Sequence, residues 1–418
     1  MSLSYSNNEV GVSQSRPAIL IPNVISSLCK FLSVKDIKEC RLVSQVWNQS
    51  ATPVLKARTR MDIELCQDNG WGGIIEKLKF SPVHVSLEVK DESIPSPDPE
   101  VPFPLMENLK SLWLNCEGGN QPGKDFCHKI ILTSAPILQE LELECSNDPD
   151  VPALQPGTLF PKLKDLGISY WWELEDDAAE KVAQIITACP ALECLRTYYS
   201  YLDGFGRMKL LQKLPPSFSS LTLDGDLNAD GLEVLLKIPS PLKKLTFEIQ
   251  YDAELQKGDY LQENLYKLLH KHSPTLEKLS ISFPSAFDKI MEWKFPVFSA
   301  MKVFQIQMGM NNKISFQSRR GKFGWIDYHK SFPVLESLHV CSDSVFPGFS
   351  SVDQFLPKGS GGSESVKRVE MVVSYDAKRE ANMAARTDLY DRLVKTFPNG
   401  RDSITITPFD NRNFMWRE

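Results

Sequence analysis

A short phrase recurs along most of the chain and constrains its fold more than any other feature. It reads L-x-x-L-x-L, with Ile, Phe, Met, Val or Thr replacing leucine in some copies, and successive copies start 24 to 34 residues apart. The ten copies begin at Leu109, Leu138, Leu163, Leu192, Phe218, Leu242, Leu276, Met301, Leu335 and Val366. Because apolar residues alternate with polar ones at its end, each phrase predicts a short strand with one buried face.

Helical patterns lie between the phrases. Residues 175–188 begin with acidic side chains, which favour a helix N-terminus, and continue with an apolar face at helical spacing. Residues 230–237 and 259–272 look similar, and prolines such as Pro190 and Pro274 follow as helix stops. Strand and helix at a repeating period predict a solenoid, in which each unit buries its apolar face against its neighbours. A compact α/β domain is the weaker alternative, because it would not need ten copies of one phrase.

The phrase and its period resemble the leucine-rich-repeat family, whose usual period is about 20–29 residues. The resemblance implies an α/β fold: an irregular horseshoe-shaped solenoid with about ten repeats over residues 105–375, within a domain of residues 61–418. Segments without the full phrase are expected to cap the two ends. They are the strand-like residues 61–65 and 83–89, a last helix over 387–397 and a last strand over 403–407.

The N-terminal sixty residues follow a different pattern. Residues 1–16 are polar and are expected to form a disordered tail. Apolar residues at helical spacing predict a first helix over 21–32, and Ser33 is a candidate N-cap for a second helix over about 34–40. A third helix is expected from about residue 42, with Pro53 marking a kink or an early break. Three short helices make a poor core, so we expect a subdomain that packs on the rest of the chain or a docking surface for another protein.

Residues 17–60 contain a stretch that resembles the F-box family. The family pattern is matched in order and spacing by Ile21, Pro22, Val24, Ile25, Leu28, Phe31, Leu32, Ser33, Asp36, Ile37, Cys40, Arg41, Val43, Ser44 and Trp47. Asn23 departs from the pattern, since the family usually has Glu there. The match covers about a tenth of the chain, residues 21–50.

The F-box resemblance implies two partners and a set of contact residues. F-boxes of this kind bind the Skp adaptor, which links them to a cullin scaffold. The resemblance places Pro22, Ile25, Leu28, Leu32, Val43 and Trp47 at the adaptor interface, with Trp47 shared between interface and internal packing. The chain would then be the substrate-recognition subunit of a Skp–cullin–F-box ubiquitin ligase that binds an unknown target protein. The alternative is a leucine-rich-repeat scaffold or inhibitor in which the F-box-like helices only cap the solenoid.

Composition and motifs narrow the classes of function. The formal net charge of −6 gives no reason to expect nucleic acid or an anionic membrane as a partner, and no apolar run approaches a membrane span. Nine cysteines without a C-x-x-C pair suggest reduced thiols in the cytoplasm or nucleus. Neither a phosphate-binding loop, a nucleophile elbow nor a metal-ligand spacing is present, so we expect no cofactor, no metal and no catalysis by this chain.

Two regions are candidates for binding the target. In each strand, the residues between the buried ones should face the concave surface, which selects Trp113, Glu142, Glu144, Arg196 and Tyr198, with Trp171 just past a strand. Exposed aromatics with a few charges are typical of binding hot spots, although some of these rings could instead cap the core. The second candidate is a basic and aromatic loop with Arg319, Arg320 and Trp325, which could hold an acidic or phosphorylated segment or could be a plain surface loop.

Overall fold

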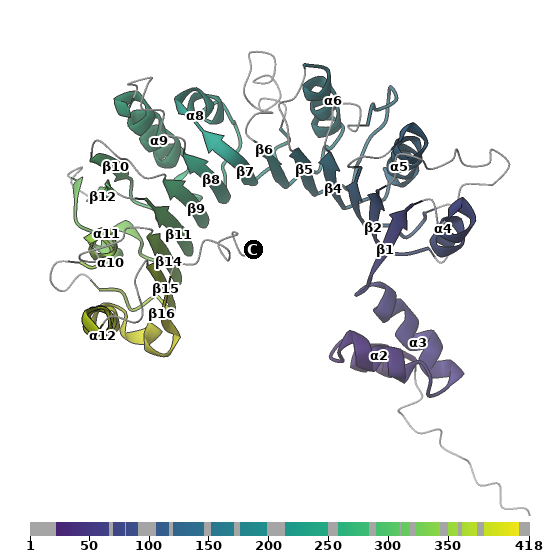
Figure 1. Cartoon of the computed structure of the whole chain (residues 1–418), viewed down its shortest axis with the longest axis horizontal. Coiled ribbons are helices and arrows are strands. Elements are labelled where there is room, and N and C mark those ends of the chain that lie inside the picture. Colours follow the sequence, from purple (N-terminus) through teal and green to yellow (C-terminus); the bar gives the residue numbers. More distant parts are fainter. Residues whose placement is uncertain are drawn as a thin grey trace, which may run out of the picture.

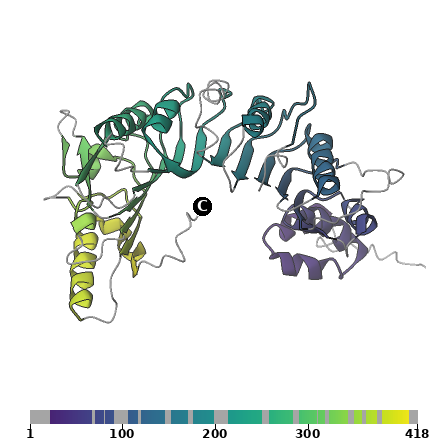
Figure 2. The same cartoon turned by 45° about the horizontal axis from the view of Figure 1, so that its top comes forward.

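The computed structural model shows an arc of repeating strand and helix (Figure 1). It describes residues 22–66, 70–79, 81–90, 106–116, 120–145, 152–170, 176–198, 214–249, 258–283, 290–309, 311–317, 323–342, 350–357, 362–373 and 380–408. Strands line the inner side of the arc and helices lie along its outer side. Three N-terminal helices lie beyond the β1 end of the arc, and α12 lies at the opposite end (Figure 2).

The inner side of the arc is one parallel sheet of thirteen strands whose order follows the chain. The strands are β1 (Arg60–Leu65), β2 (His84–Val89), β3 (Ser111–Asn115), β4 (Glu140–Cys145), β5 (Asp165–Tyr170), β6 (Cys194–Tyr198), β7 (Ser220–Leu227), β8 (Lys244–Ile249), β9 (Lys278–Phe283), β11 (Val303–Met308), β14 (Ser337–Ser342), β15 (Arg368–Val373) and β16 (Ile404–Pro408). Ten of them, from β3 to β15, coincide with the ten phrases. The predicted mixed α/β architecture is therefore confirmed.

Helices cover the outer side of the sheet. They are α4 (Gly70–Lys79), α5 (Gln121–Ser134), α6 (Asp176–Thr187), α8 (Ala229–Leu235), α9 (Gly258–His272), α10 (Tyr328–Ser331), α11 (Ser350–Asp353) and α12 (Glu380–Thr396). Two begin at asparagine N-caps, since the side chains of Asn120 and Asn228 accept from the N–H groups of Gly123 and Gly231. The helices expected from the sequence over 175–188, 230–237 and 259–272 lie within a few residues of α6, α8 and α9.

The main core lies between the sheet and these helices. Leu112 and Leu114 on β3 and Leu141 and Leu143 on β4 are buried, while the residues between them are partly exposed. One continuous cluster of buried apolar side chains extends from Ile63 on β1 to Ile406 on β16. Each unit thus buries its leucines against the adjacent units, as expected for stacked repeats.

A second, smaller sheet was not predicted from the sequence. It consists of β10 (Met291–Phe295), β12 (Asn312–Gln317) and β13 (Phe323–Gly324), with β10 and β12 parallel and β13 antiparallel to β12. Trp293 and Phe316 of this sheet are buried in the main core. It lies between the phrases of β9 and β14, where the distances between phrase starts are irregular, and it therefore adds a local layer to the arc.

The three N-terminal helices, α1 (Pro22–Cys29), α2 (Val34–Cys40) and α3 (Gln45–Lys56), form a bundle that we call the N-terminal module. Its buried residues Ile25, Cys29, Ile37, Ala51 and Leu55 form a cluster separate from the main core. The side chains of Ser33 and Ser44 cap α2 and α3, which confirms the N-cap predicted at Ser33. The expected early break at Pro53 is wrong, because α3 continues to Lys56. The predicted tail, residues 1–16, lies outside the described residues.

Candidate functional site

The N-terminal module exposes an unusual number of apolar side chains. Eleven large hydrophobic residues are exposed in the described part of the chain, and five of them belong to this small module. They are Val24, Leu28, Phe31, Leu42 and Val43, and Phe31 and Leu42 are 88% and 80% exposed. Contiguous or clustered apolar exposure on a soluble protein marks an interaction surface, whereas isolated exposed residues need no explanation.

The six predicted adaptor-contact residues divide into three groups. Pro22, Leu28 and Val43 are exposed, so their side chains are available to a partner. Leu32 and Trp47 are half-buried and pack against the module's own core. Ile25 is fully buried in that core, so its side chain is not available to a partner in this conformation. The helical period placed Ile25 on the apolar side of α1, but only the packing of α3 against α1 decides which apolar residues remain outside.

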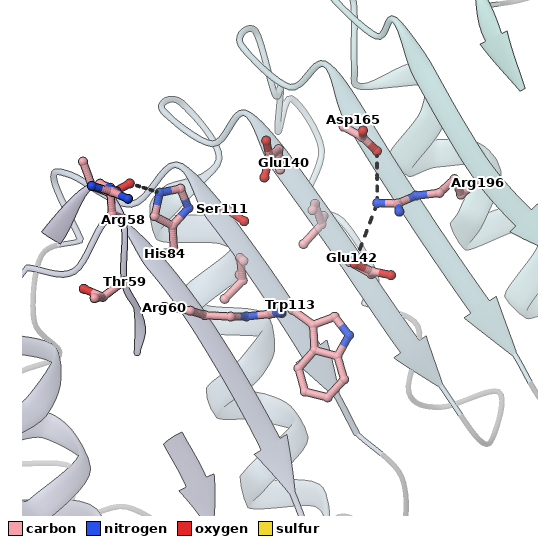
Figure 3. A pocket seen from close by; sticks show the side chains of 13 residues that line it. Arg58, Thr59, Arg60, His84, Ser111, Trp113, Glu140, Glu142, Asp165 and Arg196 are labelled. Atoms are coloured by element: carbon pink, nitrogen blue, oxygen red, sulfur yellow. Dashed lines mark hydrogen bonds and ion pairs between the residues drawn. The ribbon is translucent and has the colours of Figure 1, made fainter. Parts of the chain in front are cut away.

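A hollow on the concave face is the second candidate site. By the concave face we mean the side of the sheet that faces the inside of the arc, opposite to the buried leucines. The hollow has a volume of about 420 Å³ and lies over β1 to β6, next to the end of α3 (Figure 3). Its lining includes Arg60, Trp113, Glu140, Glu142 and Arg196.

Charged side chains from neighbouring strands meet across this hollow. The Arg196 guanidinium on β6 lies 3.7 Å from the Glu142 carboxylate on β4 and 3.5 Å from that of Asp165 on β5. Gly167 separates Glu142 from Arg196 in the strand register. A Cβ atom built on Gly167 would lie 3.2 Å from Cγ of Glu142, so the glycine leaves the space through which the ion pair reaches across β5.

The indole of Trp113 is the aromatic element of the hollow. The Arg60 guanidinium lies 5.2 Å from the centre of its ring, within the range of a cation–π contact. Its Nε1–H donates to Oε1 of Glu144 at 3.1 Å. These two contacts hold the ring in a defined orientation. Because the Trp113 side chain is only partly buried, the ring also retains surface that a partner can contact.

Polar contacts hold the N-terminal module together and attach it to the arc beside this hollow. Arg58 donates to the backbone oxygen of Leu32, and also to that of Cys29 at 3.4 Å. Nε2 of His84 on β2 lies 3.2 Å from the backbone oxygen of Ala57, directly after α3. The Arg58 contacts stay within the module, and the His84 contact connects the module to the first strands in addition to the chain itself.

The predicted target-binding residues are only partly brought together. Trp113, Glu142, Glu144 and Arg196 all lie on the concave face near the hollow, as the alternation predicted. Tyr198 ends β6, and its side chain lies outside the description. Trp171, Arg319 and Arg320 lie outside the described residues. Trp325 is 50% exposed and follows β13, away from the hollow.

Arg58, Arg60 and His84 were not predicted from the sequence as site residues. All three line the hollow, but they belong to the end of the N-terminal module and to the two strands that lack the full phrase. The alternation of Ile63 and Leu65 with polar residues was the signal that could have placed Arg60 on the concave face. The sequence predicts these two strands only as a cap of the solenoid, and the structure shows that they also line the hollow.

Two features of the described residues bear on chemistry, the grouping of metal-ligating side chains and the state of the thiols. Among the described residues, no group of three or more His, Cys, Asp or Glu side chains could hold a metal ion. Burial raises the pKa of the Cys189 thiol to about 12 and also raises that of Cys194, so neither is an activated nucleophile. No described helix is long and apolar enough to cross a membrane. Comparison with protein-family models and with curated proteins finds no match for this chain.

Proposed function

We propose that this chain is a substrate-recognition subunit of a Skp–cullin–F-box ubiquitin ligase. In this proposal, the N-terminal module is an F-box that docks to the Skp adaptor and through it to a cullin. The arc is a leucine-rich-repeat domain whose concave face binds a target protein. The F-box-like residue pattern, the recurring phrase and the arc of parallel strands support the proposal together.

The observation that carries the proposal is the apolar exposure of the N-terminal module. Val24, Leu28, Phe31, Leu42 and Val43 are exposed although the module has a core of its own. Leaving such side chains in water costs free energy of the order of 25 cal/mol for each Å² of apolar area. A partner protein that covers them would recover this free energy. Four of the five, Val24, Leu28, Phe31 and Val43, are matched positions of the F-box pattern.

The same observation argues against the alternative in which these helices only cap the solenoid. A cap would bury its apolar face against β1 and β2. Instead, Pro22 and Leu28 are exposed, and the buried residues of the module form a cluster separate from the main core. The contacts between Arg58, His84 and the backbone of the module are polar, and they fix its position without covering its apolar residues.

In this function the chain carries out no bond-making step. It holds a target protein near a charged ubiquitin-conjugating enzyme, which raises the effective concentration of the acceptor lysine. The side-chain contacts of Arg58 and His84 would matter here, because a fixed angle between adaptor and target narrows the space that the target can occupy.

The adaptor-docking claim can be tested with purified full-length protein and a Skp adaptor. The Leu28→Asp/Val43→Asp double variant places two charges at exposed apolar positions of the module. If both positions are interface hot spots, binding should weaken by about 100-fold or more. We choose Val43 rather than Leu32, because Leu32 packs within the module and its substitution would also unfold the helices.

The matched control is Leu159→Asp/Val334→Asp, which changes two exposed apolar residues outside the module. The control should bind the adaptor as the wild type does, and circular dichroism should show that both variants are folded. Absence of binding by the wild type would overturn the proposal. Equal binding by the two double variants would overturn it as well.

A further inference from the structure

We propose that the concave face over β1 to β5 binds a basic segment of the target, in which lysine or arginine side chains contact the carboxylates around Trp113. The inference rests on the proposed function, since it names the chemistry of the segment that the substrate receptor would hold. It concerns the N-terminal part of the concave face and does not extend to the rest of the arc.

The charge on this part of the face is strongly one-sided. The strand register of β1 to β6 puts seven carboxylates and two cations at concave positions, and Lys90, directly after β2, adds a third cation. The carboxylates are Asp62, Glu64, Glu88, Glu140, Glu142, Glu144 and Asp165, and the cations are Arg60, Lys90 and Arg196. Pairing each cation with one carboxylate leaves an excess of negative charge on one continuous surface.

The internal contacts of the cations do not remove this excess. Arg196 is shared between Glu142 and Asp165, and Lys90 is shared between Glu64 and Glu88, 3.2 Å from each. Each of these cations therefore faces two carboxylates. Asp62 and Glu140 are exposed and carry the surplus toward the solvent inside the arc.

The rest of the concave face has a different balance. Over strands β7 to β16, the concave register positions hold four carboxylates and three cations, a surplus of one carboxylate against four over β1 to β6. The carboxylates are Asp224, Asp226, Glu248 and Glu370, and the cations are Lys244, Lys278 and Arg368. The acidic surplus is therefore concentrated over β1 to β6, although the same sheet continues to β16. A basic ligand is attracted more strongly to this N-terminal part of the face.

Trp113 supplies the contact that makes this surface more than a charged patch. Its ring is in the middle of the acidic region and already receives one guanidinium, that of Arg60, at 5.2 Å from its centre. A lysine or arginine of a bound segment can contact the same ring and a neighbouring carboxylate together. Half-buried tryptophan beside charged groups is the composition of interface hot spots.

The dimensions suit a short extended segment. Adjacent strands are about 4.8 Å apart, so the distance from β1 to β5 is about 19 Å. An extended chain covers this distance with about six residues. The sign of the charge excludes nucleic acid and anionic lipid as ligands for this surface, because both would be repelled by it.

The test uses the full-length protein and two fluorescent dodecapeptides, one alternating lysine or arginine with serine and the other alternating glutamate or aspartate with serine. Fluorescence anisotropy should show at least about 10-fold tighter binding of the basic peptide, decreasing as salt increases. The Asp62→Asn/Glu140→Gln variant should weaken that binding about 5-fold or more, since each exposed pair contributes up to about 1 kcal/mol. Among the described residues, neither Asp62 nor Glu140 has an ion-pair partner that the substitution would remove.

The matched control is Glu180→Gln/Glu292→Gln, which removes the same net charge from exposed positions on α6 and β10, outside the concave face. It should leave peptide binding within about 2-fold, which separates a local site from attraction to the acidic molecule as a whole. Equal weakening by both double variants, or equal binding of the two peptides, would overturn the inference. Adaptor binding is measured in parallel. If the wild type does not bind the adaptor, the proposed function is overturned, whereas the comparison of the two peptides still decides whether this surface binds a basic segment.

Discussion

The two ends of the arc use one backbone plan with different side chains. Over β1 to β6, the core consists mainly of leucine and isoleucine, and the concave face carries an excess of carboxylates around Trp113. Toward the C-terminus, the core is aromatic and a second sheet is added. Of the eleven largest fully buried side chains, eight lie between Phe283 and Phe332.

This contrast suggests that the C-terminal end of the arc contributes mainly to packing and the N-terminal end mainly to binding. Aromatic rings bury large areas and interlock, as Phe298, Phe304 and Phe332 do with centroid distances of 5.2 to 5.5 Å. The added layer makes the C-terminal region the thicker end, with a more aromatic core. The N-terminal region lacks this second sheet. Its distinctive residues, Trp113 and the carboxylates, lie on the concave surface at the hollow, beside the N-terminal module.

The largest effect should come from the aromatic core. Phe332→Ala removes a fully buried ring that lies 5.2 Å from Phe304 and 5.6 Å from Phe316, measured between centroids. We expect the free energy of unfolding to fall by about 3–5 kcal/mol, measured by chemical denaturation. Val334→Ala, at a 42% exposed position two residues away, should change it by less than about 1 kcal/mol. A small effect of Phe332→Ala would mean that the aromatic end is not the more tightly packed one.

The next effect is a pH dependence at the junction of the two ends. His272 closes α9, its Nδ1 accepts the N–H of Leu242 at 3.2 Å, and burial together with the Lys271 charge lowers its pKa to about 4 from 6.5. Between these values the unfolded chain binds a proton that the folded chain does not, so stability falls as the pH decreases from about 6.5 to 4. The lost stability approaches about 3 kcal/mol.

The measurement is urea denaturation of the wild type and of His272→Gln at several pH values. Gln keeps a hydrogen-bond acceptor for the Leu242 N–H but has no proton to gain. The difference between the two proteins should therefore change between pH 6.5 and 4 and stay constant above pH 7. Parallel curves over the whole range would show that folding does not lower the pKa of His272.

The smallest effect on stability, with the clearest effect on binding, is expected at Gly167. Gly167→Val adds a side chain against Cγ of Glu142 and obstructs the ion pair between Glu142 and Arg196. We expect the free energy of unfolding to change by no more than about 1 kcal/mol, because that pair is partly exposed and Val favours strands. Affinity for the basic dodecapeptide should decrease. Unchanged affinity would place the binding surface elsewhere on the concave face.

The sequence by itself determined the elements that depend on local patterns. Each phrase alternates buried and exposed residues within six positions, and such alternation fixes which residues face the core, whatever lies far away. All ten phrase strands, α6, α8, α9 and α2 were predictable for this reason. The same reasoning placed Trp113, Glu142 and Arg196 on the concave face.

Only the tertiary structure decided which of these side chains meet. The ion pairs of Arg196 join residues that are 31 or more positions apart in the chain, and they depend on the strand register and on the space at Gly167. Likewise, packing of α3 against α1 buried Ile25 and left Leu28 outside. The spacing of apolar residues predicts which side of a helix or strand faces the core. Contacts between elements depend on how those sides are stacked, and the spacing within one element does not contain that information.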